Sequence, residues 1–243
     1  MPLCAASQMT PPELSALSDD FETMAGNWLT DNEQGGSAGY INDPVDGGVY
    51  FIRPNVNSGW YGTTATGFHL YKVVHGDFRM RAQMRVLNDA GVTEFSNGGI
   101  LFRAVRDCVP PEHDRVWFLL DHGFQDLAGS SSGGPQQGVL WKQNVFVPQG
   151  DGGTFETTTA FTANNSPTIT IEMCRVGNTV RGCFNTDNAT WHCQGPYTNN
   201  ILTGAGIHAG ITAGIFSPTG AGLMEAHFDN VVFDAMTDGG CER

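Results

Sequence analysis

A strict alternation of apolar and polar residues between positions 77 and 87 constrains the fold of this chain more than any other feature. Every second position is apolar, and the positions between are arginine or glutamine. Period-two alternation over nine residues predicts a β-strand with one face in a core and the other toward solvent. The apolar set is Phe78, Met80, Ala82, Met84 and Val86, and the polar set is Arg79, Arg81, Gln83 and Arg85.

Similar short strands recur along the chain, with turn residues roughly every 8 to 12 positions, a spacing typical of β-sandwiches and barrels. The Gly177-Asn178 pair is one such turn signal. No amphipathic helix of useful length and no dividing linker is visible. We therefore expect an all-β, single-domain chain. Its expected parts are an N-terminal arm over residues 1–17, a sandwich over residues 18–235 and a tail over residues 236–243.

The charge balance argues against several classes of partner. The formal net charge is −13, and only 15% of the 243 residues are charged. A protein that follows nucleic-acid phosphates needs a basic surface, so we expect no nucleic-acid partner. No run of 18 apolar residues occurs, so no membrane span is predicted. The start of the chain lacks the regions of an export signal, and we expect any such signal to have been removed.

Six cysteines indicate an oxidising compartment. None lies in a Cys-x-x-Cys pair, the common spacing of zinc and thioredoxin-like sites. An even number of scattered cysteines favours disulfides, and hence a secreted, extracellular or cell-surface protein, over free buried thiols. The sequence leaves the pairing open. We expect Cys4 to pair with Cys241, because the termini of sandwiches often lie on neighbouring strands.

Four segments stand out when they are taken in order: Asp19–Glu22 followed by Trp28, Gly76–Arg81, Asn97–Arg103 and Phe228–Phe233. In this order they resemble the concanavalin A-like lectin/glucanase superfamily, in particular bacterial laminin-G-like modules and 3-keto-disaccharide hydrolase-type domains. The resemblance covers residues 18–234 and implies a jelly-roll β-sandwich of two antiparallel sheets, about 12 to 14 strands in all, with a carbohydrate-facing surface.

Six residues are the predicted saccharide site. Arginines and tryptophans on one sheet face would supply planar polar groups for hydroxyls and flat rings for sugar faces. The alternative is an ion-paired sheet face without a ligand, in which Arg103 pairs with Asp121 and the tryptophans belong to the core. The predicted ligand-binding residues are Arg81, Arg85, Arg103, Trp117, Asp121 and Trp141.

The same resemblance argues against one hydrolase activity and suggests a metal. Laminarinase-type hydrolases of this superfamily carry a Glu-x-Asp-x-x-Glu strand that sets two carboxylates on one face, and this chain has no such strand. If the protein is an enzyme, we expect it to use Asp121, Glu172 or Glu225 with Arg103. The resemblance also implies a structural Ca²⁺, for which the expected ligands are Asp229, Asp20 and Glu22. An exposed edge aspartate is the alternative for Asp229.

These observations favour an extracytoplasmic, non-catalytic carbohydrate-binding module of the lectin type. A glycoside-active hydrolase or lyase on the same fold is the first alternative. A structural or self-assembling surface protein is the second, since exposed strand edges can pair with other chains. The sequence makes no prediction about the oligomeric state.

Overall fold

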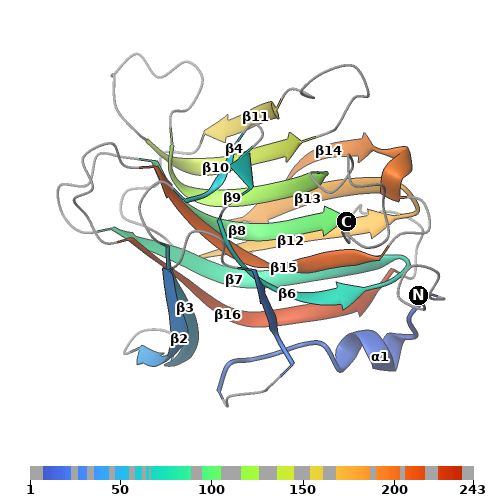
Figure 1. Cartoon of the computed structure of the whole chain (residues 1–243), viewed down its shortest axis with the longest axis horizontal. Helices are drawn as coiled ribbons and strands as arrows, with labels where there is room; N and C mark the ends of the chain where they lie inside the picture. Colours follow the sequence, from blue (N-terminus) through green and yellow to red (C-terminus); the bar gives the residue numbers. More distant parts are fainter. Residues whose placement is uncertain are drawn as a thin grey trace.

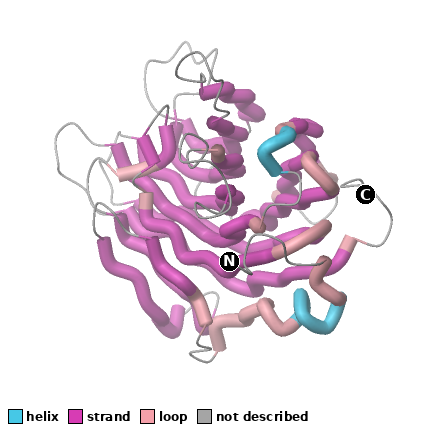
Figure 2. Tube along the Cα trace, turned by 45° about the vertical axis from the view of Figure 1, so that its right-hand side comes forward, coloured by secondary structure: helices cyan, strands magenta, loops and turns pink. Residues whose placement is uncertain are grey.

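The computed structural model is a sandwich of two antiparallel sheets with seven strands each (Figure 1). It describes residues 8–22, 27–31, 36–43, 47–54, 58–61, 64–65, 67–88, 95–104, 116–125, 136–144, 154–160, 168–186, 190–202, 206–216 and 224–236. Fourteen strands in two antiparallel sheets confirm the predicted all-β sandwich. Figure 2 shows the strand layers with the two short helices at their margin.

The first sheet, called the front sheet here, has the order β1-β6-β15-β8-β9-β10-β11. Its strands are β1 (Leu29–Asp31), β6 (Phe68–Val74), β15 (Ile207–Phe216), β8 (Phe95–Ala104), β9 (Trp117–Gln125), β10 (Gln136–Asn144) and β11 (Thr154–Ala160). A two-stranded ladder of β4 (Trp60–Tyr61) and β5 (Thr64–Ala65) forms a third, small sheet.

The second sheet, called the back sheet, has the order β14-β13-β12-β7-β16-β3-β2. Its strands are β14 (His192–Thr198), β13 (Thr179–Asn185), β12 (Ile169–Val176), β7 (Phe78–Asn88), β16 (Met224–Ala235), β3 (Gly47–Pro54) and β2 (Gly36–Asp43). Strand β16 carries a bulge between Asp229 and Val232, where Asn230 adopts a positive φ of 49°.

The core lies between the sheets and contains the alternating apolar residues of β7. The apolar side chains from Phe78 to Val86 point inward and are at most 1% exposed, whereas the arginines between them are half-buried. Phe78 meets Phe102 of the front sheet with ring centroids 5.0 Å apart. Burial of such aromatic and aliphatic side chains is the main favourable term in folding. The predicted periodicity of β7 is confirmed.

Residues 8–17 pack against the sandwich. Helix α1 (Pro11–Ser15) begins after Thr10, whose backbone N–H donates to Glu13 Oε2 at 2.7 Å. Leu14 of this helix is completely buried in the core. Ahead of it, Gln8 Nε2 donates to the carbonyl of Asp77 at 2.9 Å. The 3₁₀-helix η3 (Asn200–Leu202) likewise contributes a buried leucine.

Disulfides confirm the predicted use of cysteine. Cys183 of β13 and Cys193 of β14 are directly opposite and form one bridge. Cys174 is also disulfide-bonded, and no described cysteine is free. The predicted pair of Cys4 and Cys241 lies outside the described residues. Among the described residues, no helix has the length and apolar character needed to cross a membrane.

The buried His122 predicts a loss of stability in acid. Burial lowers the pKa of His122 from 6.5 to about 4, and its hydrogen bond with the Gly138 carbonyl offsets this only in part. The unfolded chain therefore binds a proton before the folded chain does, and stability is lost as the pH falls from 6.5 through 4. We expect this group to contribute about 3 kcal/mol to the difference between pH 7 and pH 4.

Urea unfolding of the His122→Gln variant at both pH values measures this contribution. The variant should show a smaller drop in the free energy of unfolding than the unmodified protein does. His192→Gln, at an exposed position of β14, is the control and should keep the full drop. An unchanged pH dependence in His122→Gln contradicts the assignment.

Candidate functional site

The structure does not bring the six predicted saccharide-binding residues together. Arg81 and Arg85 lie on β7 in the back sheet, and the other four belong to the front sheet. Of those four, Trp141 belongs to the core between the sheets. Its ring packs so closely on Gly182 of the back sheet that a Cβ added to this glycine would lie 2.7 Å from the ring. The prediction of one patch is therefore wrong. The alternation of residues correctly predicts which side chains share a face of one strand. It does not predict which strands share a sheet, and β7 and β8 are in different sheets although they follow each other in the chain.

The residues expected to serve an enzyme are separated in the same way. Asp121 and Arg103 are on the front sheet, whereas Glu172 and Glu225 are on the back sheet. Glu225 is ion-paired with Arg53 and accepts a hydrogen bond from His227 Nε2 at 2.9 Å. These four residues therefore cannot form a single catalytic site.

Arg103 is held in a buried ion pair on the outer face of the front sheet. Its Nη1 lies 2.9 Å from Oδ2 of Asp31 on β1, a partner that the sequence did not predict. The guanidinium is only 2% exposed and lies 5.6 Å from the ring centroid of Trp60. A guanidinium over an indole face adds a cation–π attraction. Trp117, directly opposite Arg103 on β9, is completely buried.

A stack of three rings beside Arg103 was not found by sequence reasoning. His69 and Tyr71 alternate on β6, and their ring centroids are 4.9 Å apart. His208 of β15 stacks on the other side of Tyr71 at 4.1 Å. The register of β6 and β15 pairs Tyr71 with Gly210 and Val73 with His208, which brings the three rings into one row.

Trp60 of β4 covers this row from outside the sheet. Its Nε1 donates to Thr212 Oγ1 at 2.8 Å. Its ring meets those of His69 and Trp117 edge to face, each at 5.9 Å. Together, these side chains are called the front cluster, which consists of Asp31, Trp60, His69, Tyr71, Arg103, Trp117 and His208.

Three polar atoms of the front cluster are buried without a hydrogen bond. They are Nδ1 and Nε2 of His69 and Nε1 of Trp117, none of which meets the distance and angle of a hydrogen bond with the described residues. Burial lowers the pKa of His69 well below its usual value, and nearby His208 and Arg103 lower it further. A polar contact with the backbone of Leu101 raises this pKa slightly, but the contact is too poorly aligned to count as a hydrogen bond. His69 is therefore neutral at physiological pH. Buried polar groups usually have partners, so unpaired ones mark a place for water or a ligand.

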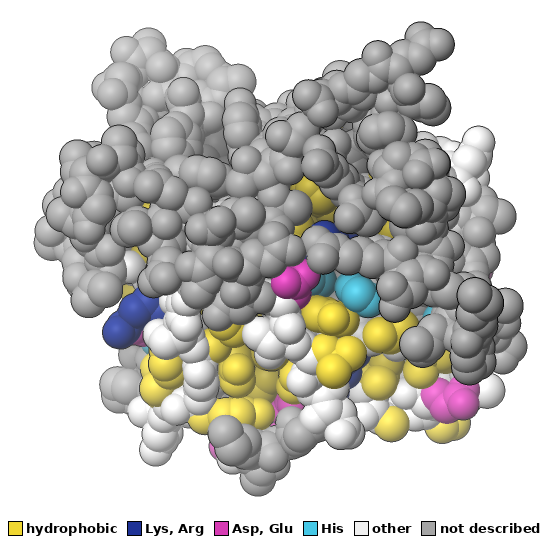
Figure 3. Space-filling model, in the orientation of Figure 1, with side chains coloured by type: hydrophobic (Ala, Val, Ile, Leu, Met, Phe, Trp, Pro, Cys, Tyr) yellow, Lys and Arg dark blue, Asp and Glu magenta, His cyan; other side chains and the backbone are white. Residues whose placement is uncertain are grey.

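The accessible edge of the front cluster consists of its three half-buried members, Asp31, Tyr71 and His208. The remaining four are at most 2% exposed. Figure 3 shows acidic, histidine and basic side chains close together near the middle of the face seen in Figure 1. The edge thus offers a carboxylate and two rings, supported by buried neighbours that fix their positions.

The predicted calcium ligands do not form a metal-binding group. Among the described residues, no three His, Cys, Asp or Glu side chains lie close enough together to hold an ion. Asp20 lines a depression of about 260 Å³ together with Asn230, whereas Glu22 lines a different one of about 420 Å³. The side chain of Asp229 accepts a hydrogen bond from Asn230. These residues do not fit a calcium site as a set, and calcium binding stays a prediction outside the proposal below.

No family model and no curated protein matches the chain. Solved structures share its fold at low identity. A GH43 protein, BlXynB, from Bacillus licheniformis matches 90% of this chain with a TM-score of 0.60 and 12% identity. The match covers only 39% of that protein. Lectin II from Ulex europaeus matches with a TM-score of 0.53 and 9% identity, covering 90% of this chain and 98% of the lectin.

A functionally unknown protein from Saccharomyces cerevisiae also matches, with a TM-score of 0.54 and 13% identity over 85% of this chain and all of that protein. These likenesses show that the chain shares its β-sandwich fold with a lectin and with part of a GH43 protein. At such identities they carry no residue roles.

Proposed function

We propose that this protein is an extracytoplasmic carbohydrate-binding protein whose front cluster contacts the saccharide. The observation that carries the proposal is the set of unpaired buried nitrogens of His69 and Trp117 behind the accessible Asp31, Tyr71 and His208. Saccharide sites combine flat rings with a few fixed polar groups, and this edge has both. The disulfides and the presence of a lectin among proteins of the same fold support the proposal.

Binding to a glycan array, followed by calorimetry on the strongest ligand, tests this function. We expect Tyr71→Ala to weaken binding by at least about tenfold, because an aromatic ring in a saccharide site contributes more than 1 kcal/mol. Tyr71→Phe, which preserves the ring stack with His69 and His208, should retain most of the affinity. Equal affinity of Tyr71→Ala and the unmodified protein would remove the front cluster from the binding site.

The same cluster favours acid–base chemistry as a second candidate function. At its accessible edge, the carboxylate of Asp31 and the imidazole of His208 are groups that can exchange protons, and the hydroxyl of the neighbouring Tyr71 can donate a hydrogen bond to developing negative charge. Release of new chain ends from a bound polysaccharide would identify an enzyme. In that case Tyr71→Phe should bind substrate but lose turnover, whereas a lectin should release no product in either form.

A further inference from the structure

The outer face of the back sheet, on the opposite side of the sandwich from the front cluster, carries a pocket. It has a volume of about 280 Å³, near the lower end of the range for small-molecule sites and suited to one ring-sized unit. Strands β7, β12, β13 and β16 form its floor, and Trp191 lies at its rim just ahead of β14. The polar lining residues are Arg81, Gln83, Thr170, Asn185 and Asn230.

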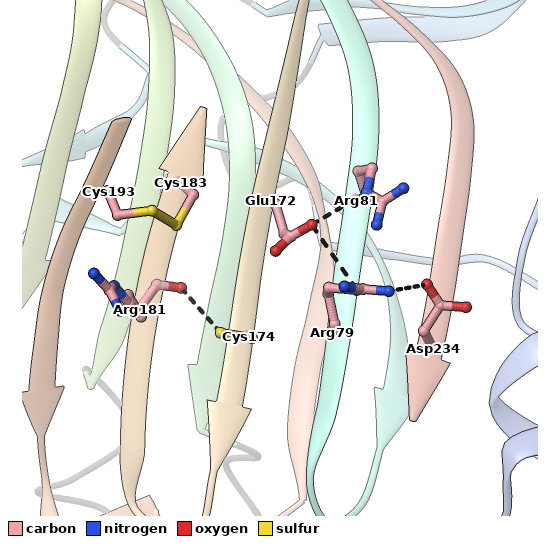
Figure 4. Close-up of polar contacts among 8 residues, drawn as sticks. All are labelled: Arg79, Arg81, Glu172, Cys174, Arg181, Cys183, Cys193 and Asp234. Carbon is pink, nitrogen blue, oxygen red and sulfur yellow. Dashed lines mark hydrogen bonds and ion pairs between the residues drawn. A yellow bond between two sulfur atoms is a disulfide. The ribbon is translucent and has the colours of Figure 1, made fainter. Parts of the chain in front are cut away.

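Arg81 presents the terminal edge of its guanidinium to this pocket. Its Nε lies 3.1 Å from Oε2 of Glu172, which is directly opposite on β12. Figure 4 shows the two terminal nitrogens of Arg81 turned away from Glu172. Within the described part of the chain, these two nitrogens have no hydrogen bond or ion pair. Two parallel N–H donors in a fixed plane match the two oxygens of a carboxylate.

Neighbouring charges hold Arg81 in this orientation. Glu172 is only 5% exposed at its side chain, and it also lies 3.9 Å from Nε of Arg79. Arg79 in turn pairs through Nη2 with Oδ2 of Asp234 on β16 at 3.0 Å. Figure 4 shows this chain of contacts across three strands. Because Glu172 occupies only the Nε edge of Arg81, the terminal edge stays available to a ligand.

The rest of the lining suits the ring and hydroxyls of a sugar. Trp191 is half-buried, and Gln83 and Asn230 are exposed. The bulge in β16 sets Asn230 beside the pocket, and bulges commonly re-aim side chains at binding sites. No acidic residue is among the described lining residues, although the protein carries a net charge of −13.

We propose that this pocket binds one carboxylated sugar unit, such as a hexuronate of an acidic polysaccharide. The carboxylate lies against the terminal nitrogens of Arg81, and the sugar ring packs on Trp191. The amides of Gln83 and Asn230 bind hydroxyls. The site is independent of the front cluster, so the protein contacts saccharides on both faces of the sandwich.

Titration calorimetry with tetragalacturonate and with its fully methyl-esterified form tests this site. The two probes share every hydroxyl and differ in the carboxylates. We expect the acid to bind at least about tenfold more tightly than the ester, a difference of about 1.4 kcal/mol, because only the acid offers a charged acceptor to the guanidinium. Arg81→Gln should abolish this preference, and Trp191→Ala should weaken binding of both probes.

Two further variants separate recognition from folding and from the front cluster. Arg81→Lys retains a charge beside Glu172 but loses the planar edge, and it should also lose the tenfold preference. Arg85→Gln, on the same face of β7 but outside the pocket lining, is the matched control and should keep it. Equal binding of acid and ester, or an unchanged preference in Arg81→Lys, overturns the proposal. So does loss of tetragalacturonate binding in Tyr71→Ala, which would place the ligand at the front cluster.

Discussion

Gly210→Ala should lower the free energy of unfolding by about 3 kcal/mol, the upper part of the usual range for overpacking. A Cβ at Gly210 would lie 2.0 Å from the carbonyl oxygen of Leu70 and 2.6 Å from the Cα of Tyr71. Both atoms belong to the backbone of β6, which cannot move aside without breaking its ladder with β15. Since that ladder aligns Tyr71 with His208, saccharide binding should fall together with stability.

Equilibrium unfolding in urea measures the effect, and Gly39→Ala is the matched control. Gly39 is also in a strand, but the atom nearest to its Cβ position is a ring carbon of Phe51 at an ordinary 3.4 Å. We expect that substitution to change stability by less than about 1 kcal/mol. If the two variants have the same midpoint and slope, the close approach of β6 and β15 is not as described.

Arg103→Ala should destabilise the protein by about 3 kcal/mol, the lower end of the cost of breaking a buried ion pair. Arg103 is 2% exposed, and its removal leaves the carboxylate of Asp31 without its cation. The side chain of Asp31 is 27% exposed, so water compensates part of the loss. The ring of Trp60 also loses the guanidinium packed against it.

Arg53→Ala provides the comparison for an exposed pair. Arg53 is ion-paired with Glu225, but its side chain is 41% exposed. An exposed pair contributes about 1 kcal/mol or less, so this variant should unfold close to the unmodified protein. Urea midpoints of the two alanine variants therefore should differ clearly. A larger loss in Arg53→Ala than in Arg103→Ala would contradict the buried position of Arg103.

The fold could be predicted from the sequence because strand periodicity reports directly on burial. In β7 one face is in the core and the other faces solvent, and the alternation of its residues is sufficient to predict both faces. The number of strands followed from turn spacing, which depends on local sequence and was therefore predictable. Their antiparallel arrangement in two sheets was implied by the family resemblance.

The composition of the site depends on strand pairing, which periodicity does not contain. Arg81 and Arg103 were expected in one patch because each lies on the polar face of its strand. Strand β7 pairs with β12 and β16, however, whereas β8 pairs with β9 and β15. The alternation of residues predicts correctly which side chains lie on the outer face of each strand, but the two strands belong to opposite sheets.

The ring stack of the front cluster was missed, although Arg103 and Trp117 were among the predicted residues. Leu70 of β6 faces the core, and His69 is completely buried beneath Trp60 on the other side. The sequence of β6 shows a histidine and a tyrosine two positions apart, but it does not show that Trp60 covers them. The contact with His208 depends on the pairing of β6 with β15, two strands far apart in the chain, which no local signal reveals.

Mapping a bound saccharide onto backbone amides by nitrogen–proton NMR tests the central claim most directly. The ligand is the strongest neutral saccharide from the glycan array, so the carboxylate-selective pocket of the back sheet is not engaged. We expect the largest shift changes at Asp31, Tyr71 and His208, in fast or intermediate exchange, with the amides of β12 and β13 unmoved. Two results would contradict carbohydrate binding by the front cluster. One is that the amide shift changes are confined to the back sheet, and the other is that no saccharide from the array changes the shifts of these three amides.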